Sequence, residues 1–350
     1  MLIARLGVAG LLWAQSSTLL DRLYPVSLAL DTARLRSLYD QASESEALAH
    51  LGFLASDAMQ GRDAGTPFEK VAATYLIVQH QRWGNAPLLP NGYVHAFPLL
   101  SPKKDPPPTS KPQSRKRKAA PSTPPPSYDT LQAWNVLAIR RGTVHPTQYV
   151  ILSAHYDHLG TSEKGQVYNG ADDNGSGTAV LLEAARLLSQ LPPPRRSIVF
   201  FHTAAEEKGL LGAFRFVRDS LLPIDSVLAV INTDMLGRRD KEHQDEPLHL
   251  YAIGSDRATP RLRQLHEAVN ALCCGWKFDY RYDDPNDPQK LFTRSDHYAF
   301  ARKGVPAVFY FGGLHDDYHR PSDDVDKIEP DRLRRSAALM AALAWTLANL

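Results

Sequence analysis

Four short apolar runs stand out in the hydrophobic pattern of the chain, at residues 149–154, 197–201, 227–231 and 305–311. Each run has the length of a strand and is apolar at successive positions, which is typical of strands buried on both faces of a sheet. Stretches with helical periodicity alternate with the runs, at residues 177–190, 210–221, 260–272, 295–303 and 330–350. This alternation predicts an α/β fold: a three-layer sandwich in which helices cover both faces of a central mixed, mostly parallel sheet.

The N-terminal part of the chain predicts helices over much of residues 30–83. Asp31 stands before an amphipathic stretch, at a position that favours an N-cap. Thr66, Pro67 and Glu69 have the spacing of an N-cap, a first-turn proline and an acid at the third helical position. We therefore expect a helix to begin after each of these two caps.

Residues 101–128 have a different composition, rich in proline and with a basic run at 115–118. Such a stretch cannot pack into a core, so we expect a disordered surface insertion in an otherwise single domain that covers residues 15–350. A basic run can bind nucleic acid, but the formal net charge of only +2 gives no general indication of it. A solvated loop is the favoured interpretation, and no nucleic-acid partner is expected.

The N-terminus has the pattern of an export signal. Arg5 precedes an apolar stretch at 6–14, so residues 1–14 are predicted to be a signal peptide, although a buried helix is the alternative. No cysteine follows the stretch, which argues against a lipid anchor, and no later segment is apolar for the ~18 residues that a membrane span needs. We therefore expect a secreted or periplasmic protein without a membrane span.

The chain has two cysteines, and they are neighbours, Cys273 and Cys274. A bridge between adjacent residues is strained, so we expect no disulfide framework. Two thiols are also too few for a structural zinc site built from thiolates.

Residue types that bind metals follow each apolar run. These candidate ligands are His155, Asp173, Glu207, Asp234 and His319. In open α/β sheets ligands bind outside the carboxyl ends of the strands, so side chains that follow several strands can meet there. Each motif also has a simpler explanation, such as helix capping for Asp173 or an interaction of adjacent acids with a helix dipole for Glu207. Taken together they favour a metal site.

In this order the motifs resemble the secreted di-zinc aminopeptidases, whose wider superfamily includes glutamate carboxypeptidases and glutaminyl cyclases. The motifs that carry the resemblance lie at residues 155–157, 173–177, 206–207, 232–235 and 318–319. A segment at 51–62 is also similar to the N-terminal part of that family. The resemblance covers about residues 45–335 apart from the insertion.

The resemblance implies two zinc ions per chain, each with its own set of ligands. His155 and Asp234 would bind one ion, Glu207 and His319 the other, and Asp173 would bridge them. Charge supports two ions, because three carboxylates and two neutral imidazoles offer more ligands than one tetrahedral catalytic zinc uses. Two zinc ions leave one positive charge, which a hydroxide can neutralise.

The resemblance also implies catalytic roles. Glu206 would act as general base, Asp157 would orient His155, and Tyr318 would steady the tetrahedral oxyanion. The implied activity is hydrolysis of the N-terminal residue of peptides that have a free N-terminus.

Two other readings remain. A glutaminyl cyclase or a carboxypeptidase of the same superfamily is one, although cyclases usually carry Trp where Tyr318 stands here. A metal-free binding module on the same fold is the other, and it is disfavoured because every expected ligand position holds a competent residue.

Ser295, Asp296 and His297 invite a serine-hydrolase interpretation, but adjacent side chains do not face one another on a helix. We expect Ser295 to cap a helix instead. His158 and Asp172 are expected to play only supporting roles around the metal site.

Overall fold

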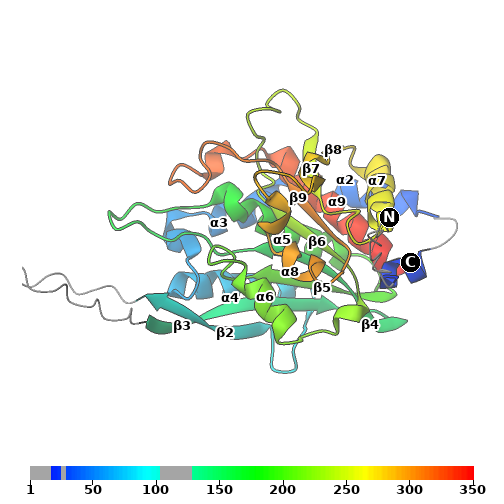
Figure 1. Cartoon of the computed structure of the whole chain (residues 1–350), viewed down its shortest axis with the longest axis horizontal. Coiled ribbons are helices and arrows are strands. Elements are labelled where there is room, and N and C mark those ends of the chain that lie inside the picture. The colour runs from blue at the N-terminus through cyan, green and yellow to red at the C-terminus, as the bar shows by residue number, and fades with distance from the viewer. Residues whose placement is uncertain (1–16, 25–28, 103–127) are drawn as a thin grey trace, which may run out of the picture.

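The computed structural model describes residues 17–24, 29–102 and 128–350 (Figure 1). The predicted signal peptide lies outside the described residues, and so does most of the predicted insertion. Strands flank that segment, and Pro102 on one side of it pairs with Tyr128 on the other.

One sheet of nine strands forms the centre of the described part of the chain. The strands are β1 Ala86–Pro87, β2 Val94–Pro102, β3 Tyr128–Arg140, β4 His145–His155, β5 Arg196–Thr203, β6 Val227–Asp234, β7 His249–Ile253, β8 Lys277–Asp279 and β9 Ala307–Phe311. Their order is β1-β3-β5-β4-β6-β9-β7-β8, and β2 pairs with the outer side of β3. The four predicted strands β5, β4, β6 and β9 are adjacent and parallel, whereas β3 and β7 join them antiparallel.

Helices lie on both faces of this sheet, as the alternation predicted (Figure 1). They are α1 Leu19–Leu23, α2 Thr32–Gln41, α3 Glu44–Leu54, α4 Pro67–Arg82, α5 Gly177–Ser189, α6 Leu211–Arg218, α7 Pro260–Cys273, α8 His297–Ala301 and α9 Pro330–Asn349. Asp31 and Thr66 cap α2 and α4 through their side chains, and Pro67 occupies the first turn of α4. The predicted mixed α/β fold is therefore confirmed.

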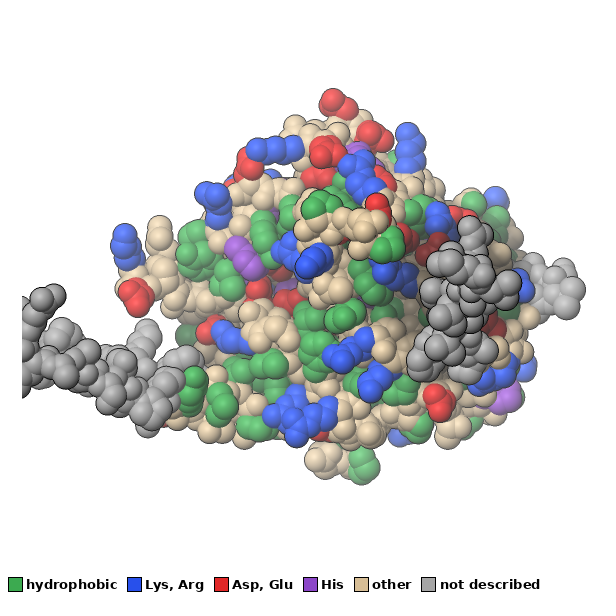
Figure 2. All heavy atoms as spheres, in the orientation of Figure 1, with side chains coloured by type: hydrophobic (Ala, Val, Ile, Leu, Met, Phe, Trp, Pro, Cys, Tyr) green, Lys and Arg blue, Asp and Glu red, His purple; other side chains and the backbone are tan. Residues whose placement is uncertain are grey.

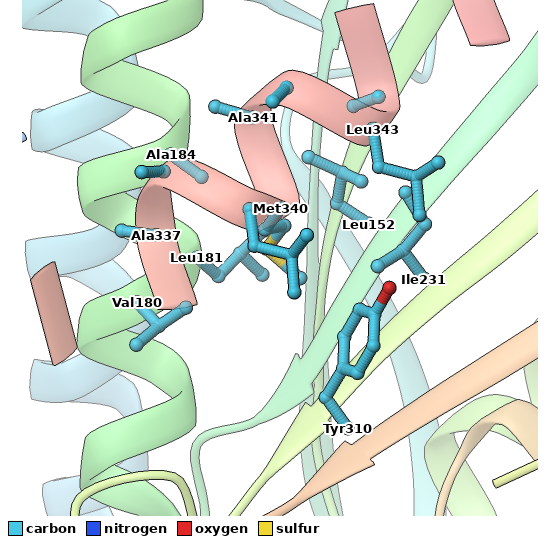
Figure 3. Close-up of a cluster of buried hydrophobic side chains, with 14 of the residues drawn as sticks. Leu152, Val180, Leu181, Ala184, Ile231, Tyr310, Ala337, Met340, Ala341 and Leu343 are labelled. Atoms are coloured by element: carbon cyan, nitrogen blue, oxygen red, sulfur yellow. The ribbon is translucent and has the colours of Figure 1, made fainter. Parts of the chain in front are cut away.

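The core consists of apolar layers on the two faces of the sheet. Leu152 and Ile231 point toward α5 and α9, where they lie with Leu181 and Met340 (Figure 3). Ile151, one residue before Leu152, belongs instead to the cluster that packs under α6 and α8. Successive residues of a strand point to opposite faces, so a strand covered on both sides has to be apolar throughout.

The expectation for the cysteines was wrong. Cys273 and Cys274 form a disulfide at the C-terminal end of α7, with their Cα atoms 3.8 Å apart. The helix ends at Cys273 and Cys274 serves as its C-cap, so the bridge does not have to fit within a regular helix.

Two further expectations concern surfaces. No helix among the described residues is long and apolar enough to cross a membrane. Figure 2 shows Lys and Arg side chains scattered over the visible face among acidic and apolar ones.

Candidate metal centre

The sheet brings the predicted ligands to one edge. His155 and Asp234 are the last residues of β4 and β6, which run parallel and next to each other. Glu207 follows β5, and His319 follows β9. Asp173 lies in the irregular turn Ala171–Ser176 that leads into α5, where its peptide bond to Asn174 is cis. The carboxyl ends of parallel strands meet at this edge, which is where α/β folds bind ligands.

One group of ligand atoms surrounds the imidazole of His155. Its Nε2 lies 3.3 Å from Asp234 Oδ1 and 3.4 Å from Asp173 Oδ1. Glu206 Oε2 lies slightly further away, at 3.9 Å. His155, Asp173 and Asp234 are all buried and offer three ligand atoms close enough to share one metal ion.

A second group lies on the other side of Asp173. His319 Nε2 is 3.0 Å from Asp173 Oδ2 and 3.2 Å from Glu207 Oε2. Asp173 Oδ2 is buried, yet it accepts no hydrogen bond of good geometry from the described residues. A buried acceptor normally has a partner. Asp173 therefore faces both groups of ligand atoms: its Oδ1 lies toward His155 and its Oδ2 lies toward His319.

The charges of the site favour a cation. Burial opposes protonation of His155, but the carboxylates of Asp234 and Glu206 raise its pKa well above the ordinary value. Burial likewise opposes protonation of His319, yet Asp173 and Glu207 raise its pKa to about 10. The carboxylates thus hold positive charge on both imidazoles, and metal ions would supply that charge while leaving the imidazoles neutral as ligands. The donor set of carboxylate oxygens and imidazole nitrogens fits zinc.

His158 approaches the second group more closely than its expected supporting role required. Its Nδ1 lies 2.8 Å from Glu207 Oε1 and 3.9 Å from Asp173 Oδ2. It is fully buried, and its Nε2 has no hydrogen-bond partner among the described residues. The geometry therefore offers His158, beside His319, as an imidazole that could contact a metal at Glu207.

Glu206 and Asp157 lie beside the first group. Burial, the largest influence, raises the pKa of Glu206 well above its ordinary value. Asp157 accepts a hydrogen bond from the backbone N–H of Glu206 at 3.1 Å. Its carboxylate is 3.9 Å from His155 Nδ1, whereas its backbone carbonyl is only 3.2 Å away. Asp157 therefore contacts both residues, and its carbonyl is the nearer partner of the imidazole.

Ser295 does not cap a helix. It donates a hydrogen bond to Asp234 Oδ2 at 2.8 Å and accepts one from the side chain of Asn232 at 2.8 Å. The N-cap of α8 is Asp296, which makes no capping hydrogen bond with its side chain. The expectation was wrong because the sequence did not show that β6 ends beside this turn, where the hydroxyl finds a carboxylate partner.

Asp323 and Arg62 support the Asp173 turn, and sequence reasoning missed both. Asp323 accepts hydrogen bonds from the backbone N–H groups of Asp172 and Asp173 at 3.0–3.1 Å. Arg62 is fully buried and donates to the carbonyls of Asn169 and Gly170, just before the turn. Arg62 belongs to the segment 51–62 that resembles the family, but the sequence gave neither residue a role, because their partners are distant along the chain.

Asp172 has the supporting position that was expected. It accepts a hydrogen bond from the backbone N–H of Gly237 at 2.6 Å, and its other oxygen lies 3.1 Å from His315 Nε2. It thereby joins the Asp173 turn to the loop that follows Asp234.

The backbone around the site is strained at three places. Ala205, Met235 and His319 have φ angles of 56°, 52° and 57°, a left-handed conformation that residues other than glycine rarely adopt. Ala205 precedes Glu206, and Met235 follows Asp234. Such strain costs roughly 1–3 kcal/mol per residue and persists only where surrounding packing enforces it.

A pocket opens over the two groups. Its polar lining is His155, Asp173, Glu206, Asp234, Arg294, Tyr318 and His319, and its apolar lining is Met235, Leu291, Phe309, Phe311 and Leu314. Tyr318 stacks on His319 with ring centroids 3.9 Å apart. Burial and the charge of Asp173 raise the pKa of Tyr318 above its ordinary value, so its phenol keeps its proton.

A third group of metal-binding residue types, His243, His249 and Asp279, lies away from this pocket. Arg281 already donates to Asp279 Oδ2 at 2.7 Å and to His243 Nε2 at 3.2 Å. The two imidazole rings are also stacked nearly parallel. The guanidinium of Arg281 therefore occupies the position that a metal ion would need among these side chains.

The fold and the site together define an α/β protein with a candidate metal centre at the carboxyl ends of its parallel strands. The chain belongs to Peptidase family M28, whose model matches residues 135–344. This match includes all eight residues that the sequence assigned to the site.

Among curated proteins, the chain is similar to the "Probable leucine aminopeptidase" of Arthroderma benhamiae. The two are 26% identical over 209 residues, which cover 57% of this chain and 54% of that protein. The chain therefore spans about half the length of that curated relative.

Among solved structures, the aminopeptidase from Aneurinibacillus sp. strain AM-1 has a TM-score of 0.66 at 18% identity, covering 90% of this chain and 96% of that chain. The glutaminyl cyclase of Porphyromonas gingivalis has a TM-score of 0.59 at 19% identity, covering 86% of this chain and 97% of that chain. At such identities the likeness establishes the fold alone, which the peptidase shares with the cyclase.

Proposed function

We propose that this chain is a zinc-dependent aminopeptidase that removes the N-terminal residue of peptides at a di-zinc centre. The observation that carries the proposal is the position of Asp173 between two ligand groups, with Oδ1 at 3.4 Å from His155 Nε2 and Oδ2 at 3.0 Å from His319 Nε2. In this assignment His155 and Asp234 would hold one zinc ion, Glu207 and His319 would hold the other, and Asp173 would contribute an oxygen to each.

Each residue around this centre has a separate role in the proposed reaction. When bound, the zinc ions would polarise the scissile carbonyl and lower the pKa of a bound water. Glu206 accepts the proton of the attacking water and delivers it to the leaving amine. The phenol of Tyr318, which keeps its proton, donates a hydrogen bond to the developing oxyanion. Asp157 holds the backbone N–H of Glu206 and contacts His155.

The pocket supports the choice of substrate. Its apolar wall of Met235, Leu291, Phe309, Phe311 and Leu314 suits an apolar N-terminal side chain. Its acid-rich floor attracts the free α-amine of the peptide, which favours release of the first residue over cleavage inside a chain.

The direct test combines activity with metal content. The purified protein, assayed with leucyl amides, should lose activity on chelation and recover it with zinc, and metal analysis should find two zinc ions per chain. Glu206→Gln should lower kcat by at least ~10²-fold and leave the zinc content unchanged. Asp173→Asn should instead reduce the zinc content itself. A Glu206→Gln variant with near-normal turnover would remove Glu206 from the role of base.

The same preparation separates the alternatives. Cyclisation of N-terminal glutamine without release of amino acids would identify a glutaminyl cyclase, and release from the C-terminus would identify a carboxypeptidase. Absence of zinc after loading would favour a metal-free binding module.

We also propose that the protein is exported, because Arg5 followed by the apolar stretch 6–14 has the pattern of a signal peptide. Mass spectrometry of the N-terminus after expression in a secreting host tests this proposal, and a retained Met1 in the exported fraction would contradict it.

A further inference from the structure

We propose that Arg294 binds a substrate carboxylate one residue beyond the scissile bond, so that the enzyme prefers dipeptides with a free C-terminus. This inference rests on the proposed aminopeptidase function and names the substrate class of the same site.

Arg294 is a cation that lines the catalytic pocket without an acidic partner. Its side chain is exposed, and it forms no ion pair within the part of the chain that the structure describes. By contrast, the exposed Arg281 is paired with the carboxylates of Glu242 and Asp279. Among the residues that line the pocket, Arg294 is the one with a permanently charged basic side chain.

The position of the guanidinium is fixed relative to the proposed chemistry. Its Nη2 donates a hydrogen bond to the Tyr318 hydroxyl at 3.1 Å, and Tyr318 stacks on His319. The backbone is held as well, because the next residue, Ser295, is buried and bonded to Asp234. Arg294 thus lies one hydrogen bond beyond the hydroxyl that is proposed to hold the oxyanion.

The distances in a dipeptide match this arrangement. Its terminal carboxylate carbon is three bonds beyond the scissile carbonyl carbon, roughly 3–4 Å away in space. Guanidinium has five N–H donors, and the described contacts of Arg294 use one of them. The remaining donors can bind a carboxylate through two parallel hydrogen bonds while the contact with Tyr318 is kept.

The charge of Arg294 makes this contact selective. Among the residues that line the pocket it is the permanently charged basic side chain, so a free substrate carboxylate can pair with it. A peptide amide gains no charged partner there. Arg294 therefore distinguishes a free carboxylate from a blocked or extended C-terminus.

The test compares Leu-Gly with Leu-Gly-amide in the zinc-loaded enzyme and in three variants. In the wild type, kcat/KM for the free dipeptide should exceed that for the amide by about tenfold to hundredfold, the usual effect of hydrogen bonds to a charged group. Arg294→Met should bring the ratio close to one, and Arg294→Lys should retain part of it. Arg302→Met removes an exposed arginine outside the pocket and should leave the ratio as it is in the wild type.

Leu-Asp-amide distinguishes the two sources of a carboxylate at this position. A preference that appears only with the aspartate side chain would overturn the assignment to dipeptides. An unchanged ratio in Arg294→Met, or an equal fall for both substrates, would overturn the role of Arg294, since a residue that acts only through Tyr318 affects both alike. If the wild type hydrolyses neither substrate, the proposed function fails instead.

Discussion

Asp234 shows how a single carboxylate is held for its proposed role. One oxygen faces His155 Nε2 at 3.3 Å, and the other accepts the hydrogen bond of Ser295 at 2.8 Å. Ser295 is in turn fixed by Asn232. A carboxylate that is already held by a hydrogen bond loses less conformational entropy when its other oxygen binds a metal. Hydrogen bonds to metal ligands commonly tune the affinity for the metal in this way.

We predict that Ser295→Ala weakens the site without abolishing it. Loss of the hydroxyl leaves one oxygen of Asp234 and the amide of Asn232 without their buried partner, so zinc affinity should fall about 10- to 100-fold. The free energy of unfolding should fall by about 1–3 kcal/mol. Competition with a chromogenic chelator measures the first effect and urea titration the second.

Thr293→Ala is the matched control, because Thr293 is exposed two residues earlier and its hydroxyl bonds only the carbonyl of Lys290. Equal zinc affinities in the wild type and Ser295→Ala would contradict the supporting role of the hydroxyl.

The sequence predicted the residues that follow strands but not those that hold them. His155 and Asp234 end apolar runs, and the order of the strands was enough to bring them together. Ser295 and Arg62 act through partners 61 and 107 residues away. Neither has a local pattern that distinguishes it from an ordinary loop residue, so their roles depend on a tertiary structure that the sequence alone did not give.

At the scale of elements, the central parallel strands were predictable and the outer strands were not. Strands β4 and β6 are buried along the length that faces other strands, and this burial requires an apolar run. The first residues of β3 are exposed, which gives a mixed pattern. Strand β3 also pairs with β2 across the segment whose composition indicated an insertion.

Helix α4 and strand β5 meet through two buried histidines. His80 Nε2 lies 2.9 Å from His202 Nε2, and both rings are fully buried. Burial lowers the pKa of His80 to about 3 and that of His202 well below its ordinary value. This contact ties a helix to the sheet through groups that remain neutral in the folded protein.

We predict that acid weakens this contact. Between pH 6.5 and about 3, the unfolded chain binds protons at these imidazoles and the folded protein does not, so the free energy of unfolding falls as the pH falls. The loss is about 1.4 kcal/mol per pH unit for each imidazole, and the contribution is fully present above pH 6.5. Urea titrations at pH 7.5, 6.0 and 5.0 measure it.

His80→Phe keeps an aromatic ring beside Phe200 and removes one titrating group, so its stability should depend less steeply on pH. His145→Phe is the control, because His145 begins β4 and is only half-buried. If the wild type and His80→Phe lose stability in parallel between pH 6.5 and 5, the proton linkage lies elsewhere in the molecule.

At the scale of the whole molecule, the candidate site joins segments from distant parts of the chain. Its residues follow β4, β5, β6 and β9 and precede α5, so they connect the carboxyl edge of the sheet with the loops above it. Without a cation, the buried carboxylates of Asp173 and Asp234 lie at close range beside the half-buried Glu206, and like charges in this setting destabilise the folded state.

We predict that removal of zinc lowers the thermal stability of the entire chain. A metal that binds only the folded state stabilises it by about 2.7 kcal/mol at a free concentration 100 times its Kd. At an unfolding entropy of ~2.1 cal/mol/K per residue, such a change in a molecule of this size corresponds to a fall in Tm of roughly 4 °C. Calorimetry with a chelator, then with excess zinc, measures the fall and its reversal. Asp173→Asn should show a much smaller difference between the two conditions, because the carboxylate that we propose as the shared ligand is missing. A wild-type Tm that does not change with the chelator would mean that other groups of the chain neutralise the carboxylates at this edge of the sheet.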